Sequence, residues 1–240
     1  MQKSKKTRPN HLEPHKLDRH NWIRAGVLGT SDGVVSMTAL LLGLLAAKVT
    51  FNTLWLTGLS AIVAGAFSMA IGEYVSVASQ KDIEQANIDK ETYELETEPD
   101  DELAELTGIY RHRGLSKDLA LEVAKELTAH NALEAHLRDE LGITEFAKAN
   151  PIQAAYVSFI AFALGGATPF IFSLISRKLL DNNVIELISP VIFVGIISLA
   201  FLGYFSARLG GAPIKPALTR IMLGGISAFA VSSLLGIAAG

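Results

Sequence analysis

The sequence predicts an all-α membrane protein with five transmembrane helices and a helical domain inserted between the second and the third. Half of the 240 residues are apolar, and they gather in five long runs. Each run has about the 20 residues that a helix needs to cross a hydrocarbon layer of roughly 30 Å. A soluble fold would need an implausibly large protein shell to bury all five. Four runs are uncharged and the first contains only Asp32; the runs are 25–47, 51–72, 149–176, 187–207 and 221–240.

The charged residues are strongly segregated along the chain. Residues 80–149 contain 18 Asp and Glu but only 8 Lys and Arg, whereas the rest of the chain contains 6 acidic and 13 basic residues. A net charge of -3 for the whole chain conceals this separation. The acidic segment is therefore a distinct unit, and it lies between the second and third apolar runs.

Basic residues next to the apolar runs predict the orientation, because they favour the cytoplasmic side. A basic leader, residues 1–24, places the N-terminus in the cytoplasm, and the acidic domain, 80–149, then lies on the same side after two crossings. Arg208, Lys215 and Arg220 in the fourth connection agree with this topology, whereas Arg177 and Lys178 in the third do not. We expect helices 1 and 2 within 25–79 and helices 3 to 5 within 150–240.

The acidic segment is expected to be helical. The second apolar run continues through 73–96 without glycine or proline, so its helix should extend into the cytoplasm. Pro99, followed by two aspartates, fits the first turn of a new helix, where acids suit the helix dipole. Gly114 is a typical helix end and Ser116 a typical N-cap for a third helix over 117–141.

Carboxylates recur in this segment at spacings that put them on common helix faces. Residues three or four apart share a face, and this spacing relates Glu91 to Glu94, Glu102 to Glu105, and His136 to Glu140. Clustered carboxylates repel one another unless protons or cations relieve them, and oxygen and nitrogen ligands suit divalent cations. A solvated acidic surface or a surface for a basic partner protein are the alternatives. The chain has no cysteine, which excludes disulfides, thiolate zinc sites and iron–sulfur clusters.

Asp32 is the most informative residue of the apolar runs. It lies seven residues into the first run, about 11 Å deep at 1.5 Å per residue. A carboxylate at that depth faces the interior of a bundle and marks an ion or proton pathway. The alternative is that Asp32 caps a helix that begins at Gly33.

Met69 and Glu73 are one helical turn apart in the second run. Glu73 is near the cytoplasmic end and is suited to receive a cation, while a thioether deeper in the membrane favours transition metals over magnesium or calcium. Met69 by itself is typical of packing, so its functional interpretation depends on Asp32 lying opposite.

The chain contains no phosphate-binding glycine loop, nucleophile elbow or zinc-protease helix, so no enzyme is predicted. The basic leader is explained by topology and does not indicate nucleic-acid binding. Glycines recur in the apolar runs, which favours a tightly packed bundle or a dimer. They do not decide between the two.

Several long motifs resemble one known family. They are SDGVVSMTALLLGLLAA, SMAIGEYVSVASQKDIEQA, IYRHRGLS with LALEVAKELTAHNALEAHLRDELG, and NPIQAAYVSFIAFALGGATPF. Together, in this order from about Ala25 to the C-terminus, they resemble the vacuolar iron transporter family in its bacterial form.

The resemblance implies a homodimer with five spans that moves Fe(II), and often Mn(II), out of the cytosol in exchange for protons. It implies no permanent cofactor and makes the divalent metals both substrates and ligands of the cytoplasmic domain. The family's membrane pathway falls on Asp32 and Met69, and its metal-binding glutamates fall on Glu91, Glu94, Glu102, Glu105 and Glu140. Plant members carry two adjacent methionines where this chain has His136 and Leu137, so a preference for Fe(II) over Mn(II), Co(II) or Zn(II) does not carry over.

We therefore expect a proton-coupled transporter of divalent transition metals in a bacterial cytoplasmic membrane. Its expected partners are a second copy of the chain, metal ions, protons and the bilayer, without nucleic acid. Two alternatives stay open: a membrane-anchored metal-binding or regulatory protein without transport activity, and a broad exporter of Mn(II), Co(II) and Zn(II).

Overall fold

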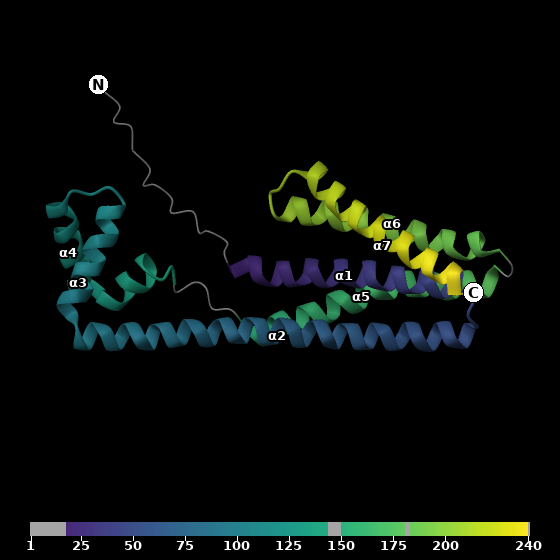
Figure 1. The fold of residues 1–240 in the computed structure, drawn as a ribbon, viewed down its shortest axis with the longest axis horizontal. Coiled ribbons are helices and arrows are strands. Elements are labelled where there is room, and N and C mark those ends of the chain that lie inside the picture. The colour runs from purple at the N-terminus through teal and green to yellow at the C-terminus, as the bar shows by residue number, and fades with distance from the viewer. Residues whose placement is uncertain (1–17, 144–149, 181–182, 240) are drawn as a thin grey trace, which may run out of the picture.

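The computed structural model describes residues 18–143, 150–180 and 183–239, and within these ranges the regular secondary structure is entirely helical (Figure 1). The helices are α1 (Asp18–Ala46), α2 (Phe51–Thr97), α3 (Pro99–His112), α4 (Lys117–Asp139), α5 (Pro151–Leu179), α6 (Val184–Leu209) and α7 (Ile214–Ala239). Five of them are long and apolar enough to span a membrane, namely α1, α2, α5, α6 and α7, which confirms the predicted number of spans.

Three spanning helices begin before their apolar runs. α1 starts at Asp18, so the end of the predicted leader is helical, while residues 1–17 of the leader lie outside the described residues. α6 and α7 likewise include charged residues in their first turns. Helical hydrogen bonding does not stop where the apolar residues stop, so apolar runs alone underestimate helix length.

α1 is the central helix of the bundle. It contacts α2, α5, α6 and α7, and Leu41, Leu42 and Leu45 on it are fully buried. Its contact with α5 is especially close: a Cβ added at Gly33 would meet the backbone of Phe162 and Gly166. Small residues permit such an approach of two membrane helices. The tight bundle predicted from the glycines is therefore present within a single chain.

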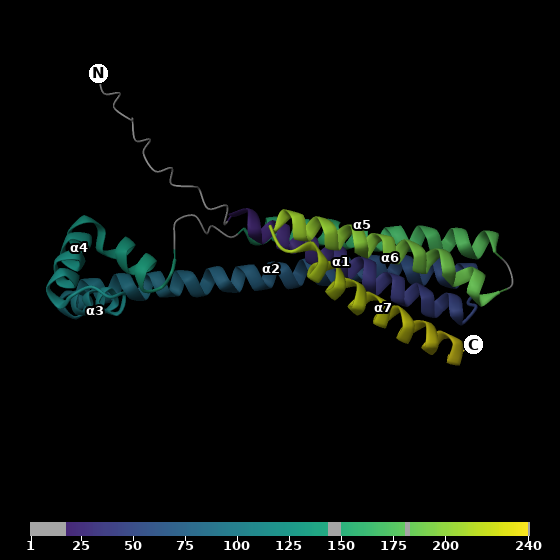
Figure 2. The same ribbon diagram turned by 90° about the horizontal axis from the view of Figure 1, so that it is seen from above.

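α2 is one continuous helix of 47 residues. Thr50 caps its start, because its hydroxyl accepts a hydrogen bond from the backbone N–H of Thr53 at 3.2 Å. The helix continues well beyond the other spanning helices, as the view from above shows (Figure 2). The predicted extension of the second span is thus confirmed.

α3 and α4 form a small unit at the far end of α2 (Figure 1). Leu106 of α3 packs against Ala124 and Ala135 of α4 to form its core. Pro99 occupies the first turn of α3 as predicted, and Gly114 has φ +99°, a value that suits glycine after a helix end. Among the described residues α3 and α4 contact only each other and α2.

The prediction of one unbroken helix over 117–141 was wrong. α4 has a break at Asn131, where φ is -164° and ψ is 93°. The Asn131 side chain accepts a hydrogen bond from the backbone N–H of Glu134 at 3.1 Å, and its amide donates to the Glu134 carboxylate at 3.1 Å. Asn131 is therefore a second N-cap within α4. The spacing of Asn and Glu resembles a capping box, and this signal marks the break in the sequence.

Candidate functional site

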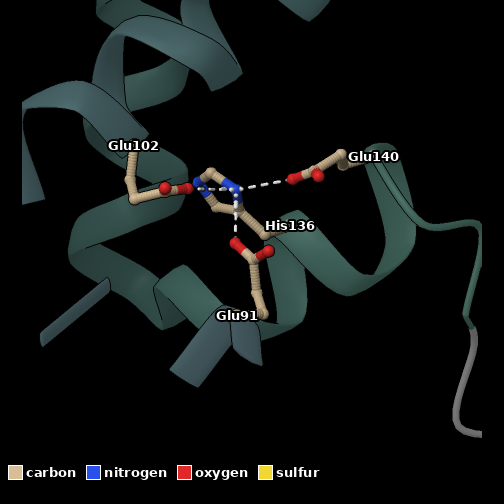
Figure 3. Close-up of side chains that lie close together, drawn as sticks. All are labelled: Glu91, Glu102, His136 and Glu140. Carbon is tan, nitrogen blue, oxygen red and sulfur yellow. Dashed lines mark hydrogen bonds and ion pairs between the residues drawn. The ribbon is translucent and has the colours of Figure 1, made fainter. Parts of the chain in front are cut away.

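Four potential metal ligands from three helices converge beside the end of α2 (Figure 3). Glu91 comes from α2, Glu102 from α3, and His136 and Glu140 from the last turn of α4 and its C-cap. One ligand atom from each of the four lies within 4.8 Å of the others. We call these four residues the acidic cluster. The break at Asn131 redirects the end of α4 and thereby determines where His136 lies.

A single imidazole nitrogen faces all three carboxylates of the acidic cluster. His136 is fully buried, and its Nδ1 lies 2.8 Å from Glu91 Oε1, 3.2 Å from Glu140 Oε2 and 3.4 Å from Glu102 Oε2. One N–H cannot satisfy three acceptors at once. The Nε2 atom of His136 has no hydrogen-bond partner among the described residues. The cluster therefore has more acceptors than its own donors can satisfy, as expected of a cation site.

The electrostatics of the cluster also favour a cation. Burial raises the pKa of Glu91 to about 7, and repulsion by Glu140 adds to the shift while His136 opposes it. Burial likewise raises the pKa of Glu102. A divalent cation would relieve both effects, since it supplies positive charge where the side chains lose contact with water. Three carboxylates and one imidazole suit a first-row transition metal.

Two of the six predicted ligands lie outside the acidic cluster. Glu94 forms an ion pair with Lys90 at 2.9 Å, and Glu105 is exposed. Both are close enough to add repulsion that raises the pKa of Glu102. Helical spacing placed them on the ligand face, but the packing of α4 decides which carboxylates meet.

Asp139 joins the end of α4 to α3 through hydrogen bonds. The sequence did not predict this role. Its carboxylate accepts hydrogen bonds of 2.7 Å each from Tyr110, Arg113 and Arg138, and Arg113 also donates to its backbone carbonyl at 3.0 Å. Glu140 follows directly in the chain. The two contacts to α3 join residues 26 and 29 positions apart, so no local pattern indicates them.

Asp139→Asn is expected to loosen the unit formed by α3 and α4. Burial alone would raise the pKa of Asp139, but the hydrogen bonds from Arg138, Tyr110 and Arg113 outweigh it and hold the pKa below its usual range. The carboxylate therefore stabilises the fold above its ordinary pKa, near 3.8, and this stabilisation is lost as the pH falls through the lowered value. At pH 7 we expect a loss of about 2 kcal/mol, seen as faster amide hydrogen exchange in 99–139. Glu122→Gln, an exposed change in α4, is the control, and equal exchange in both variants would contradict the prediction.

Asp32 and Met69 line the same cavity in the bundle. The cavity has a volume of about 270 Å³ and is lined by residues of α1 and α2 and by Phe162 of α5. The other lining residues are Ser36, Met37, Leu40, Ala61, Gly65 and Ser68. Because α1 is continuous through Asp32, this residue does not cap a helix that begins at Gly33. A carboxylate and a thioether thus lie in one space between spanning helices.

Glu73 lies outside the residues that line the cavity. It is one turn beyond Met69 on α2, it is buried, and its Oε2 atom lies 3.6 Å from the Arg24 guanidinium of α1. Of the three residues predicted for a membrane pathway, Asp32 and Met69 thus line one cavity, whereas Glu73 lies outside its lining. Arg24, which the sequence assigned only to the leader, is a second residue whose contact was not predicted.

Comparison with known proteins identifies relatives along almost the whole chain. The family model described as the VIT family matches residues 23–237. A vacuolar iron transporter of Acanthamoeba castellanii is 40% identical over 227 residues, covering 93% of this chain and 82% of the relative. Vacuolar iron transporter homolog 2.1 of Arabidopsis thaliana is 30% identical over 233 residues, covering 96% of this chain and 88% of the relative. A vacuolar iron transporter of Toxoplasma gondii is 31% identical, with 96% and 80% covered.

These matches extend across all five spanning helices and the inserted acidic unit, so they concern the complete architecture. Both the cavity with Asp32 and the acidic cluster lie inside the matched region. The family model and relatives of at least 30% identity agree with each other and with the resemblance carried by the motifs. The chain belongs to the VIT family of membrane metal transporters.

Proposed function

We propose that this protein exports divalent transition metals from the cytosol in exchange for protons, with Fe(II) and Mn(II) as its main substrates. The observation that carries the proposal is the cavity that Asp32 and Met69 share between spanning helices. A carboxylate inside a membrane is costly unless an ion or a proton uses it. A protein that only anchors a metal-binding unit has no need of such a residue.

The acidic cluster is the site where the metal is first captured in this scheme. Glu91 and Glu73 are both buried on α2, 18 residues or roughly 27 Å apart along the helix. Capture at Glu91 raises the metal concentration near the same end of the bundle as Glu73 and Arg24. The basic leader supports a cytosolic position for this end.

Inside the cavity the donor atoms favour transition metals. A thioether is a soft ligand that magnesium and calcium do not use, whereas Fe(II) accepts it together with a carboxylate, and the carboxylate also suits Mn(II). Asp32 must lose its proton to bind a cation and regain one to release it. Metal and proton thus compete for one carboxylate, and a proton gradient can drive the cycle.

A second copy of the chain is the proposed partner that completes the pathway. Asp32 and Ser36 are exposed on the open side of the single chain, where lipid would be an unfavourable neighbour for a carboxylate. We place the dimer in a bacterial cytoplasmic membrane, because the motifs quoted above resemble the bacterial form of the family.

A broader metal range is the second candidate, and His136 favours it. An imidazole among three carboxylates binds Co(II) and Zn(II) as readily as Fe(II), and their order follows coordination preference and availability. The acidic cluster contains no thioether. Capture is therefore expected to be less selective than transport through the cavity, which contains Met69.

Metal flux into proteoliposomes tests the proposal. Protein reconstituted around a metal-sensitive dye is offered Fe(II), Mn(II), Co(II) and Zn(II) in turn, with and without a pH gradient. Flux that the gradient stimulates, with Fe(II) and Mn(II) fastest, is the expected result. No flux of any metal from folded protein would favour the membrane-anchored metal-binding alternative, and equal flux of all four would favour the broad exporter.

A further inference from the structure

Glu73 is a buried carboxylate without a good partner. Its exposed fraction is 6%, and its Oε2 atom accepts no hydrogen bond within the part of the chain that the structure describes. Removing a carboxylate from water costs several kcal/mol unless charge or hydrogen bonds compensate. The buried carboxylate of Glu73 is therefore suited to bind a cation.

Arg24 is the cation that faces Glu73 in this structure. The distance of 3.6 Å between Nη2 and Oε2 is longer than a charge-assisted hydrogen bond, and the Arg24 side chain is 60% exposed. The guanidinium can therefore move into water at little cost, whereas Glu73 cannot. The contact joins the start of α1 to α2, one turn beyond Met69 and eight residues before Asp32.

We propose that Arg24 is a tethered competing cation at the mouth of the cavity, and that a divalent metal reaches Glu73 by displacing it. This inference depends on the proposed transport function. In the absence of metal the guanidinium neutralises Glu73, and when a divalent ion arrives the arginine swings into solvent. No covalent step is involved, since one cation replaces another on a fixed carboxylate.

The exchange makes Arg24 a residue that shields Glu73 from monovalent ions. A divalent ion interacts with Glu73 about twice as strongly as a singly charged one at the same distance, so it displaces the arginine more effectively than K⁺ or Na⁺ does. Without the guanidinium, monovalent ions have no tethered competitor. Arg24 therefore lowers the apparent affinity of Glu73 for every cation by the same factor. A divalent ion still binds tightly enough to displace the guanidinium, whereas K⁺ and Na⁺ do not.

Mn(II) uptake by the full-length protein in proteoliposomes tests this role. Arg24→Gln is expected to lower the KM for Mn(II) about threefold, the range of a partly exposed ion pair, and to make uptake sensitive to K⁺. Arg24→Lys keeps the charge and should behave like wild type. Lys81→Gln, an exposed change on α2, removes the same charge near the same end and controls for the surface potential.

A double-mutant cycle shows whether Arg24 acts through Glu73. In a Glu73→Gln background, Arg24→Gln should change neither KM nor the sensitivity to K⁺. An unchanged KM in Arg24→Gln, an equal shift in Lys81→Gln, or a shift that persists without Glu73 would each overturn the inference. An arginine that only stabilises the fold would alter the amount of folded protein without altering KM.

Equilibrium binding separates this inference from the proposed function. Mn(II) binding to the detergent-solubilised full chain, followed by electron paramagnetic resonance in a Glu91→Gln, Glu102→Gln background, reports the remaining sites. Tighter binding after Arg24→Gln that disappears with Glu73→Gln supports the competition even if the wild type transports nothing. If Arg24→Gln leaves Mn(II) binding unchanged while the wild type transports normally, the role of Arg24 is rejected but the proposed transport function is not.

Discussion

Asp32→Asn is expected to abolish metal transport while the acidic cluster still binds metal. Asparagine keeps the size and one oxygen, but it has no charge to attract a cation and no proton to exchange. Loss of one charged partner from a buried pair costs about 3 kcal/mol, which corresponds to a decrease in transport of about 100-fold. The readout is initial Fe(II) and Mn(II) flux in proteoliposomes under a pH gradient.

Two controls make this result specific. Glu186→Gln changes an exposed carboxylate in the first turn of α6 and should leave flux unchanged. Mn(II) binding to the acidic cluster of the solubilised Asp32→Asn protein should match wild type, because the cluster lies at the far end of α2. Full transport by Asp32→Asn would contradict the proposal that Asp32 binds the transported metal. Loss of both flux and binding would indicate misfolding.

The second large effect is expected at the acidic cluster, with Glu91→Gln combined with Glu102→Gln. These carboxylates are the two most buried of the cluster, and losing both should weaken metal binding by about 100-fold, or 3 kcal/mol. Transport should then need more metal, so KM rises while the maximal rate changes little. Calorimetry of the full-length protein and flux at several metal concentrations measure the two quantities.

The matched control is Glu94→Gln combined with Glu105→Gln. It removes the same charge from the same two helices, one turn away, but from residues outside the acidic cluster. We expect at most a few-fold weaker binding, because only long-range attraction is lost. Equal losses in the two double variants would show that all six predicted ligands act together and would reject the four-residue cluster.

The same site should bind metal more weakly in acid. Burial raises the pKa of Glu91 to about 7, so as the pH falls below 7 a metal ion must displace a proton from this carboxyl. Affinity in the wild type therefore decreases from pH 8 to pH 6. In Glu91→Gln the slope over this interval should be smaller, and this difference is measured in the calorimetric experiment.

The membrane part of the fold could be predicted from sequence because its cause is local. A run of about 20 apolar residues forms a helix wherever it crosses lipid, so the five runs predicted the five spans. Asp32 could be identified because it is the only charged residue in the first run. Met69 carried no such signal alone. Only the packing of α2 beside α1 and α5 shows that it shares a cavity with Asp32.

The acidic part was predicted less completely, because its geometry depends on contacts between distant residues. Glu91 and Glu94 lie on one helix face and cannot be distinguished by spacing, whereas the position of His136 separates them. That position depends on the break at Asn131 and on the bonds of Asp139 to α3. The pairing of Arg24 with Glu73 joins two helices, and neither residue alone predicts it.

The unbroken length of α2 also fixes a rotational relation between its two buried glutamates. Glu73 and Glu91 are separated by 18 residues, which is five whole turns of an α-helix, so both point in one direction from the helix axis. Inserting two residues between them would turn the acidic cluster by about 200° around that axis, whereas inserting seven would lengthen the helix by about 10 Å and nearly preserve its direction. Because α3 and α4 contact only α2 among the described helices, such insertions would move the whole acidic unit together, and its direction could be varied separately from its distance to the bundle.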